Sequence, residues 1–180
     1  MSQSVIVRET KETKIRVQIA RGAGVAKVST GKPFFDHMLV TFAKYAGLDL
    51  DLQATGDLTH HLMEDVGIAV GAAVHKIIPA TAARYGDRVI PMDDALVHAS
   101  LDIGGRFYYR GPLPNRLYDH WMRSFCDNAR ATLHLRILRG KDRHHILEAA
   151  FKATGLALRD ALVDSGSVFS TKGAVALEVK

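Results

Sequence analysis

Two copies of one short motif contain the side chains in this sequence that are best suited to chemistry. The copies are His60-His61-Leu62-Met63-Glu64 and His144-His145-Ile146-Leu147-Glu148. On a helix, the first His and the Glu of each copy lie at i and i+4 on one face, and the second His points about 100° round the axis. Neighbouring histidines are therefore suited to two different metal ions rather than to one. Imidazole and carboxylate groups bind Mn, Fe, Co, Ni and Zn, so the motif predicts divalent-metal binding.

A second pair of matching segments indicates that the motif belongs to a longer repeat. The segments are Phe35-Asp36-His37-Met38 and Tyr118-Asp119-His120-Trp121, which lie 83 residues apart, and the two copies of the motif lie 84 apart. Between them, the alternating stretch 48–52 aligns with 131–135. A single His pair at the start of a helix is usually a polar cap, but the duplication favours metal binding. The repeat adds His37 and His120 to the candidate ligands and predicts a duplicated chain.

The segments around these residues predict the elements that must position them. Periodicity and turn residues predict strands over 5–7, 15–19, 48–52, 96–103, 107–109 and 132–137, and helices over 35–45, 62–78, 118–128 and 145–163. The segment 107–109 is expected to return beside 96–103 after a tight turn at Gly104-Gly105. We therefore predict an α+β fold of two duplicated half-domains, each a β-sheet with helices packed on one face. The first half-repeat covers 1–86 and the second 87–180, and together they form one compact domain.

Composition restricts the classes of protein to which the chain can belong. Its 180 residues are 47% hydrophobic and 24% charged, as in a soluble protein with a core, and no apolar run reaches the roughly 18–20 residues that span a bilayer. The net charge is +5, but the basic residues are scattered, which argues against nucleic-acid binding. A phosphorylated small substrate needs only two or three cations. The N-terminus has no signal-peptide pattern, and the single Cys126 fits a reducing compartment, so we expect a cytoplasmic protein. A helical setting beside Phe125 favours core packing of Cys126 over a nucleophilic role.

Short motifs follow one another along almost the whole chain. They are Thr10-Lys11-Glu12-Thr13, Phe35-Asp36-His37-Met38-Leu39, Ala54-Thr55-Gly56-Asp57, His60-His61-x-x-Glu64-Asp65, Arg84-Tyr85-Gly86, Pro91-Met92-Asp93, Asp102-Ile103-Gly104-Gly105-Arg106, Asp142-x-His144-His145-Ile146-x-Glu148-Ala149-x-Phe151-Lys152 and Ser170-Thr171-Lys172-Gly173. This ordered series resembles the imidazoleglycerol-phosphate dehydratase family. The resemblance implies a ribosomal protein S5 domain 2-like fold and a hydro-lyase of histidine biosynthesis, which converts imidazole glycerol phosphate to imidazole acetol phosphate and water.

The resemblance also implies a metal centre and an assembly. Two manganese ions per active site are expected, with other divalent transition metals as alternatives, at sites where the subunits of a large homo-oligomer, a 24-subunit shell, meet. One ion would be held by His37, His61, His144 and Glu148, and the other by His60, Glu64, His120 and His145. The substrate imidazolate would bridge the two ions, while a carboxylate moves the carbon-bound proton.

The remaining site residues are assigned by their positions in the family's motifs. Glu12 matches the family's proton-transfer glutamate, and Asp93 is a weaker acid–base candidate. The phosphate-binding positions are Arg84, Arg106, Ser170, Thr171 and Lys172, together with Thr41. Thr41 stands where the family commonly has Gln. Two further departures are the short Leu58-Thr59 segment before the first His pair and Asp94 in place of a usual Glu. His75, His98 and His134 lack repeat support and are expected to be ordinary histidines.

Two other classes of function remain open at this point. In one, the histidines only join subunits in a metal-storage or structural shell, and Glu12→Gln would change nothing measurable. In the other, the chain is a basic nucleic-acid-binding module that binds random duplex in a salt-sensitive way. The dehydratase prediction requires turnover that depends on Glu12.

Overall fold

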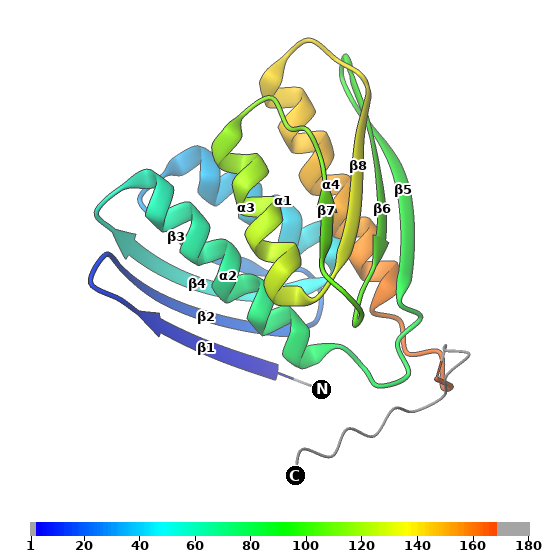
Figure 1. The fold of residues 1–180 in the computed structure, drawn as a ribbon, viewed down its shortest axis with the longest axis horizontal. Coiled ribbons are helices and arrows are strands. Elements are labelled where there is room, and N and C mark those ends of the chain that lie inside the picture. The colour runs from blue at the N-terminus through cyan, green and yellow to red at the C-terminus, as the bar shows by residue number, and fades with distance from the viewer. Residues whose placement is uncertain (1–2, 169–180) are drawn as a thin grey trace.

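The order of strands and helices along the chain repeats once (Figure 1). In the computed structural model, which describes residues 3–168, the first half contains β1 (Gln3–Glu9), β2 (Thr13–Arg21), β3 (Ala26–Ser29), α1 (Pro33–Ala46), β4 (Leu48–Gly56) and α2 (Thr59–Ile77). The second half contains β5 (Tyr85–Met92), β6 (Ala95–Asp102), β7 (Tyr108–Arg110), α3 (Arg116–Ala129), β8 (Thr132–Arg139) and α4 (Arg143–Ala161). The predicted duplication is therefore confirmed element by element.

Each half forms one four-stranded mixed sheet, and the two sheets have the same topology. The strand orders are β1-β2-β4-β3 and β5-β6-β8-β7. In each sheet the last strand runs parallel to its neighbour, and the other pairs are antiparallel. The central strands β2 and β6 alternate between buried and more exposed residues, because one face of each sheet is covered by helices.

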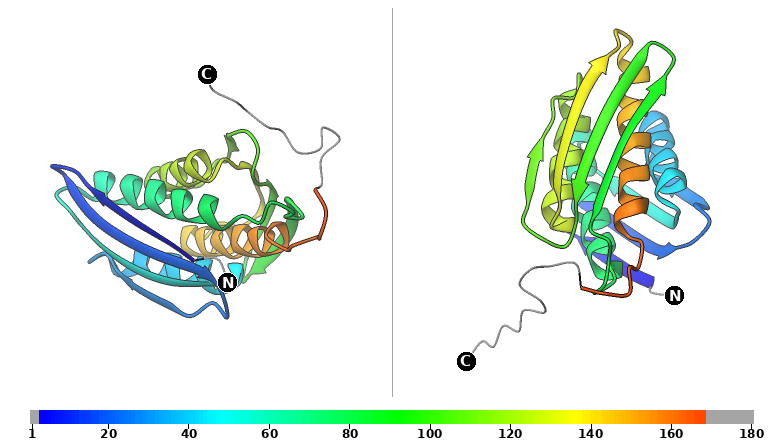
Figure 2. Two further views of the ribbon diagram at one scale, coloured as in Figure 1. Left: turned by 90° about the horizontal axis from the view of Figure 1, so that it is seen from below. Right: turned by 90° about the vertical axis from the view of Figure 1, so that its right-hand side faces the viewer.

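The four helices lie between the two sheets in two packed layers (Figure 2). Helices α1 and α2 lie on the first sheet, and α3 and α4 lie on the second. Across the middle, α2 packs on α3 and α1 packs on α4, so every helix has its main helical partner in the other half. Gly155 permits this approach on α4, because a Cβ there would come within 2.8 Å of the Phe42 carbonyl oxygen. Gly71, the equivalent residue of α2, would collide with the Phe125 carbonyl oxygen in the same way.

The core at this helical interface is aromatic. Its largest fully buried side chains include Trp121, Phe35, Phe42, Phe125 and Phe151. The Trp121 ring stacks on the rings of Phe125 and Phe151, with centroids 5.4 and 5.0 Å apart. Since these residues come from α1, α3 and α4, the core joins the two halves into one body.

Three expectations about the elements need correction. The segment 107–109 does not return beside β6. It forms β7, which pairs in parallel with β8, because the connection after Asp102 carries the chain across to the far side of β8. Strands β3 and β5 have no predicted counterpart. Because β5 is the counterpart of β1, the junction between the halves falls in 78–84, and the expected boundary after residue 86 lies inside β5.

Residues 169–180 of the second half-repeat lie outside the described residues. No helix within 3–168 is both long enough and apolar enough to cross a membrane.

Candidate active site

The packing of α1 on α4 brings three predicted ligands together. His37 from α1 meets His144 and Glu148 from the first two turns of α4, and one ligand atom from each lies within 4.8 Å of the others. The Nε2 atoms of His37 and His144 lie 3.5 and 3.2 Å from Glu148 Oε2. As predicted from their i, i+4 spacing, His144 and Glu148 lie on one face of α4. The first half of the chain supplies the third side chain, His37.

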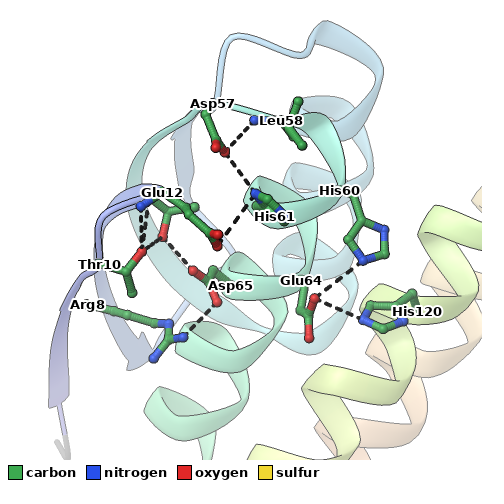
Figure 3. Close-up of polar contacts among 11 residues, drawn as sticks. Arg8, Thr10, Glu12, Asp57, Leu58, His60, His61, Glu64, Asp65 and His120 are labelled. Atoms are coloured by element: carbon green, nitrogen blue, oxygen red, sulfur yellow. Dashed lines mark hydrogen bonds and ion pairs between the residues drawn. The ribbon is translucent and has the colours of Figure 1, made fainter.

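The packing of α2 on α3 builds a second cluster of the same composition (Figure 3). His60 and Glu64 of α2 meet His120 of α3, again with ligand atoms within 4.8 Å of one another. The Nε2 atoms of His60 and His120 lie 3.5 and 3.3 Å from Glu64 Oε2. Each cluster thus takes one His from one half of the chain and a His–Glu pair from the other.

One atom in the second cluster has an environment that a bound cation would satisfy. His120 Nε2 is buried and makes no hydrogen bond, since its approach to Glu64 lacks hydrogen-bond geometry. A buried imidazole nitrogen without a partner is costly unless another group satisfies it. Two imidazoles and one carboxylate that converge within 4.8 Å are a donor set for a divalent transition metal.

The remaining two predicted ligands lie outside both clusters. Among the described residues, the groups of three that could hold a metal ion include neither His61 nor His145. Their rings lie at 75° and 79° to the rings of the preceding histidines, as expected for neighbours that point in different directions. Each predicted set of four ligands is therefore represented within one chain by three.

His61 and His145 each contact carboxylates of their own half. The Nδ1 atom of His61 lies 2.9 Å from Asp57 Oδ1 and 3.5 Å from Glu12 Oε2 (Figure 3). The Nδ1 atom of His145 lies 2.8 Å from Asp94 Oδ1. These hydrogen bonds, to Asp57 and to Asp94 respectively, raise the pKa of each histidine.

The two cluster carboxylates differ in their surroundings. Glu148 is 8% exposed, and Lys152 Nζ lies 2.9 Å from its Oε1, which leaves Oε2 facing the histidines. Burial alone would raise the pKa of Glu148, but hydrogen bonds and charge interactions with Lys152, followed by hydrogen bonds with His37 and His144, lower it overall. The carboxylate is thus held in the ionised form that metal binding requires.

The two acid–base candidates occupy turns beside these histidines. Glu12 lies in the β1–β2 turn with its side chain exposed, facing His61. Asp93 lies in the β5–β6 turn with φ at 47°, and its Oδ2 is 3.3 Å from His145 Nε2. The structure therefore brings each candidate to the second His of one motif.

The predicted phosphate-binding residues are placed only in part. Arg84, with φ at 70°, donates from its guanidinium to both Asp102 oxygens at 3.0 and 3.1 Å and to the Ile103 carbonyl oxygen. It borders the Gly105 turn that precedes the exposed Arg106. Thr41 is 6% exposed, one helical turn beyond His37. Ser170, Thr171 and Lys172 lie outside the described residues.

The other histidines lie away from both clusters. His98 Nε2 contacts Asp87 Oδ2 at 2.8 Å, and the His134 ring packs on Tyr108. His75 is partly buried in α2. Among residues 3–168, none of these three belongs to a group of three potential metal ligands.

Three polar residues at the site were given no role from the sequence. Lys152 and Asp57 lie in quoted motifs, and each stands four residues from the site residue it contacts. For Lys152 this spacing lies within α4 and was an available signal, whereas Asp57 precedes α2. Asp94 contacts a residue 51 positions away, so only the fold reveals its role.

The duplicated α+β fold and the two shared His–Glu clusters define the class: a two-half α+β protein with paired candidate metal centres at the junction of its halves. The family model described as Imidazoleglycerol-phosphate dehydratase matches residues 30–158. The chain belongs to the imidazoleglycerol-phosphate dehydratase family. It is therefore an enzyme of a hydro-lyase family of histidine biosynthesis.

Individual relatives match almost the whole chain. An imidazoleglycerol-phosphate dehydratase from Pyrobaculum calidifontis is 45% identical, over 92% of this chain and 96% of the relative. A histidine biosynthesis bifunctional protein HisB from Stenotrophomonas maltophilia is 43% identical over 96% of this chain, which spans 52% of that longer protein. The crystal structure of IGPD from Pyrococcus furiosus in complex with (S)-C348 has a TM-score of 0.84 at 40% identity, covering 94% of this chain and 100% of that one. The predicted fold class is confirmed.

Proposed function

We propose that this chain dehydrates D-erythro-imidazole glycerol phosphate to imidazole acetol phosphate in the histidine pathway of the cytoplasm. The observation that carries the proposal is the pair of clusters, His37–His144–Glu148 and His60–Glu64–His120. Family membership supports the reaction, because the relatives are named for it. The clusters supply the kind of site that it requires, namely two sets of ligands for divalent metal ions.

The ligand sets would hold two manganese ions per active site. Each cluster contributes three ligands, and His61 or His145 of a neighbouring subunit would supply the fourth. Within one chain these two histidines turn toward Asp57 and Asp94 instead, which supports sites shared between subunits of a large homo-oligomer. When bound, such ions would supply Lewis-acid chemistry that favours the deprotonated form of the substrate imidazole.

The protein side chains would bind the substrate and move its proton. Glu12 takes the carbon-bound proton beside the departing hydroxyl, and Asp93 is the second acid–base group. Arg84, Arg106, Ser170, Thr171 and Lys172 would bind the phosphate, with Thr41 near them. Of the two carboxylates, Glu12 is the better base in this geometry. Glu12 lies 3.5 Å from Nδ1 of His61, whereas Asp93 lies beside Nε2 of His145, the nitrogen that would face a metal.

The test is turnover by purified, manganese-loaded protein. The wild type is expected to convert imidazole glycerol phosphate to imidazole acetol phosphate, and Glu12→Gln to lower kcat about 10²–10⁴-fold. Metal content and particle size should stay unchanged in the variant, because Glu12 is not a proposed ligand. Glu9→Gln is the matched control, since Glu9 is also exposed and contacts only Lys14 among the described residues.

Two results would contradict the proposal. Failure of the wild type to turn over the substrate would refute the dehydratase function. Full activity in Glu12→Gln would remove Glu12 from the reaction. A wild type that binds metal and assembles without any turnover would favour a structural shell joined by the same histidines.

A further inference from the structure

We propose that Asp57 and Asp94 are positioning residues, which hold the rings of His61 and His145 so that Nε2 of each faces a metal ion. The inference rests on the proposed function, because it explains how two ligands remain ordered before a second subunit meets them. It concerns carboxylates that are not themselves ligands in either cluster.

The contact between each pair fixes which ring nitrogen is available. Asp57 Oδ1 lies 2.9 Å from His61 Nδ1, and Asp94 Oδ1 lies 2.8 Å from His145 Nδ1. A carboxylate can only accept, so Nδ1 carries the proton and the lone pair of a neutral ring is left on Nε2. A carboxylate that accepts from the second nitrogen of a metal-binding histidine orients the ring and increases its basicity.

Both carboxylates are themselves held in place by backbone groups. Asp57 Oδ1 also accepts from the Leu58 amide at 2.6 Å. Asp94 Oδ2 accepts from the amides of Lys141 and Asp142 at 2.7 and 3.2 Å. Asp94 thereby joins the β5–β6 turn to the start of α4. Each ring is thus fixed to the backbone through one side chain, as a pre-oriented ligand requires.

The two carboxylates come from positions that are not equivalent in the repeat. Strands β4 and β8 align at a separation of 83 residues up to the bulge at Leu96/Val97 and at 84 beyond it, which places Lys141 opposite Asp57. Strands β2 and β6 align at 82, which places Glu12 opposite Asp94. The duplication alone therefore does not produce the two contacts. Each half holds its second His with a carboxylate from a different loop.

This difference between the halves explains why Glu12 makes no close contact with His61. In the second half, Asp94 makes the close contact with His145. In the first half, Asp57 makes that contact with His61, so Glu12 lies farther away, at 3.5 Å. Because Asp57 orients the His61 ring, the Glu12 carboxylate is not needed for that contact and is available to the substrate. On the other side of the His145 ring, Nε2 lies 3.3 Å from Asp93, an approach that suits a cation bound there.

The test compares Asp57→Ala with Asp57→Asn in the full-length protein. The metal is stripped with a chelator, and manganese affinity is measured by competition with an indicator dye, without reference to activity. Asp57→Ala is expected to weaken manganese binding about 10–100-fold. Asp57→Asn should rescue most of this loss, because its amide oxygen still accepts from Nδ1.

Asp87→Ala is the matched control. Asp87 contacts His98 Nε2 at 2.8 Å, the same kind of pair, but it lies on β5 away from both clusters. Its manganese affinity is expected to equal that of the wild type. Asp94→Ala should weaken manganese binding as Asp57→Ala does, and should also lower the thermal midpoint, because the amides of Lys141 and Asp142 lose their acceptor.

The outcomes separate this inference from the proposed function. Unchanged manganese affinity in Asp57→Ala, or equal losses in Asp57→Ala and Asp57→Asn, overturns the positioning role even if the wild type is an active dehydratase. A loss in Asp57→Ala that Asp57→Asn rescues supports the role. That result stands even if the wild type fails to turn over imidazole glycerol phosphate.

Discussion

The two cluster glutamates occupy equivalent positions in the repeat but different surroundings. Glu148 is buried and paired with Lys152, whereas the side chain of Glu64 is 38% exposed and contacts only histidines among the described residues. The position of Lys152 corresponds to Ile68 in the first half, so the lysine belongs to one centre alone. The two ligand sets have the same composition, but their surroundings differ by the charge of Lys152, so two bound metals would experience different fields.

Cys126 provides a prediction at the residue scale. Its thiol is buried in α3, and burial, followed by the nearby charge of Asp127, raises the pKa of the thiol well above its ordinary value. The thiolate is the reactive form, so folded protein at pH 8 is expected to react negligibly with a disulfide reagent. Protein unfolded in urea should react with one equivalent, as measured by release of the coloured thiolate. Rapid reaction of the folded protein would contradict the buried placement.

At this scale, the sequence predicts side chains whose partners are close along the helix. The pairs His60–Glu64 and His144–Glu148 follow from i, i+4 spacing alone. The contribution of His37 and His120 could be expected from the repeat, but only the family resemblance assigned each one to its ligand set, because that assignment depends on how the helices pack. The contact of Asp94 with His145 crosses 51 residues, so no local pattern could predict it.

A partly buried ionic contact between β1, β2 and α2 provides a prediction at the scale of elements. Asp65 of α2 accepts from Arg8 at 2.8 Å and from the Thr13 hydroxyl at 2.5 Å. Asp65→Ala is expected to lower the free energy of unfolding by about 1–3 kcal/mol, because the buried Thr13 hydroxyl and the partly exposed Arg8 charge lose their acceptor. Urea unfolding followed by the fluorescence of the single, buried Trp121 measures the change.

The second half contains its own control for this experiment. The positions equivalent to Arg8, Thr13 and Asp65 are apolar there: they are Ile90, Ala95 and Ala149. The triple variant Arg8→Ile, Thr13→Ala, Asp65→Ala should therefore recover most of the stability lost in Asp65→Ala, since no charge remains unpaired. A triple variant less stable than Asp65→Ala would refute this interpretation.

The prediction of elements from the sequence was best where periodicity was strong. All four helices and the central strands occur where amphipathic or alternating patterns predict them. Strand β5 was missed because its outer residues Asp87, Arg88 and Val89 do not alternate in polarity, and it contains Pro91. The pairing of β7 was wrong because a turn signal at Gly104-Gly105 gives no information on which strand accepts the returning chain.

At the scale of the whole molecule, the clusters form because each helix of one half packs on a helix of the other half, α1 on α4 and α2 on α3. Each candidate metal cluster needs one helix from each half, so neither half-repeat could build a complete cluster alone. The division of the eight predicted ligands into two sets of four reflected this symmetry, since exchanging the halves converts one set into the other. Three members of each set meet within the chain. The fourth member of each set, His61 or His145, is the part of the prediction that depends on assembly.

The last prediction concerns the coupling between metal binding by His61 and subunit assembly. If His61 completes an ion held by His37, His144 and Glu148 of another subunit, one coordination bond contributes both to metal affinity and to subunit association. His61→Ala is therefore expected to lose bound manganese and to form smaller particles, and chelator treatment of the wild type should also reduce particle size. Elemental analysis and light scattering on the same samples measure the two effects. His98→Ala, which removes an imidazole outside both clusters, should retain its metal and its size. A His61→Ala protein with wild-type manganese content and wild-type particle size would show that the site is complete within one subunit.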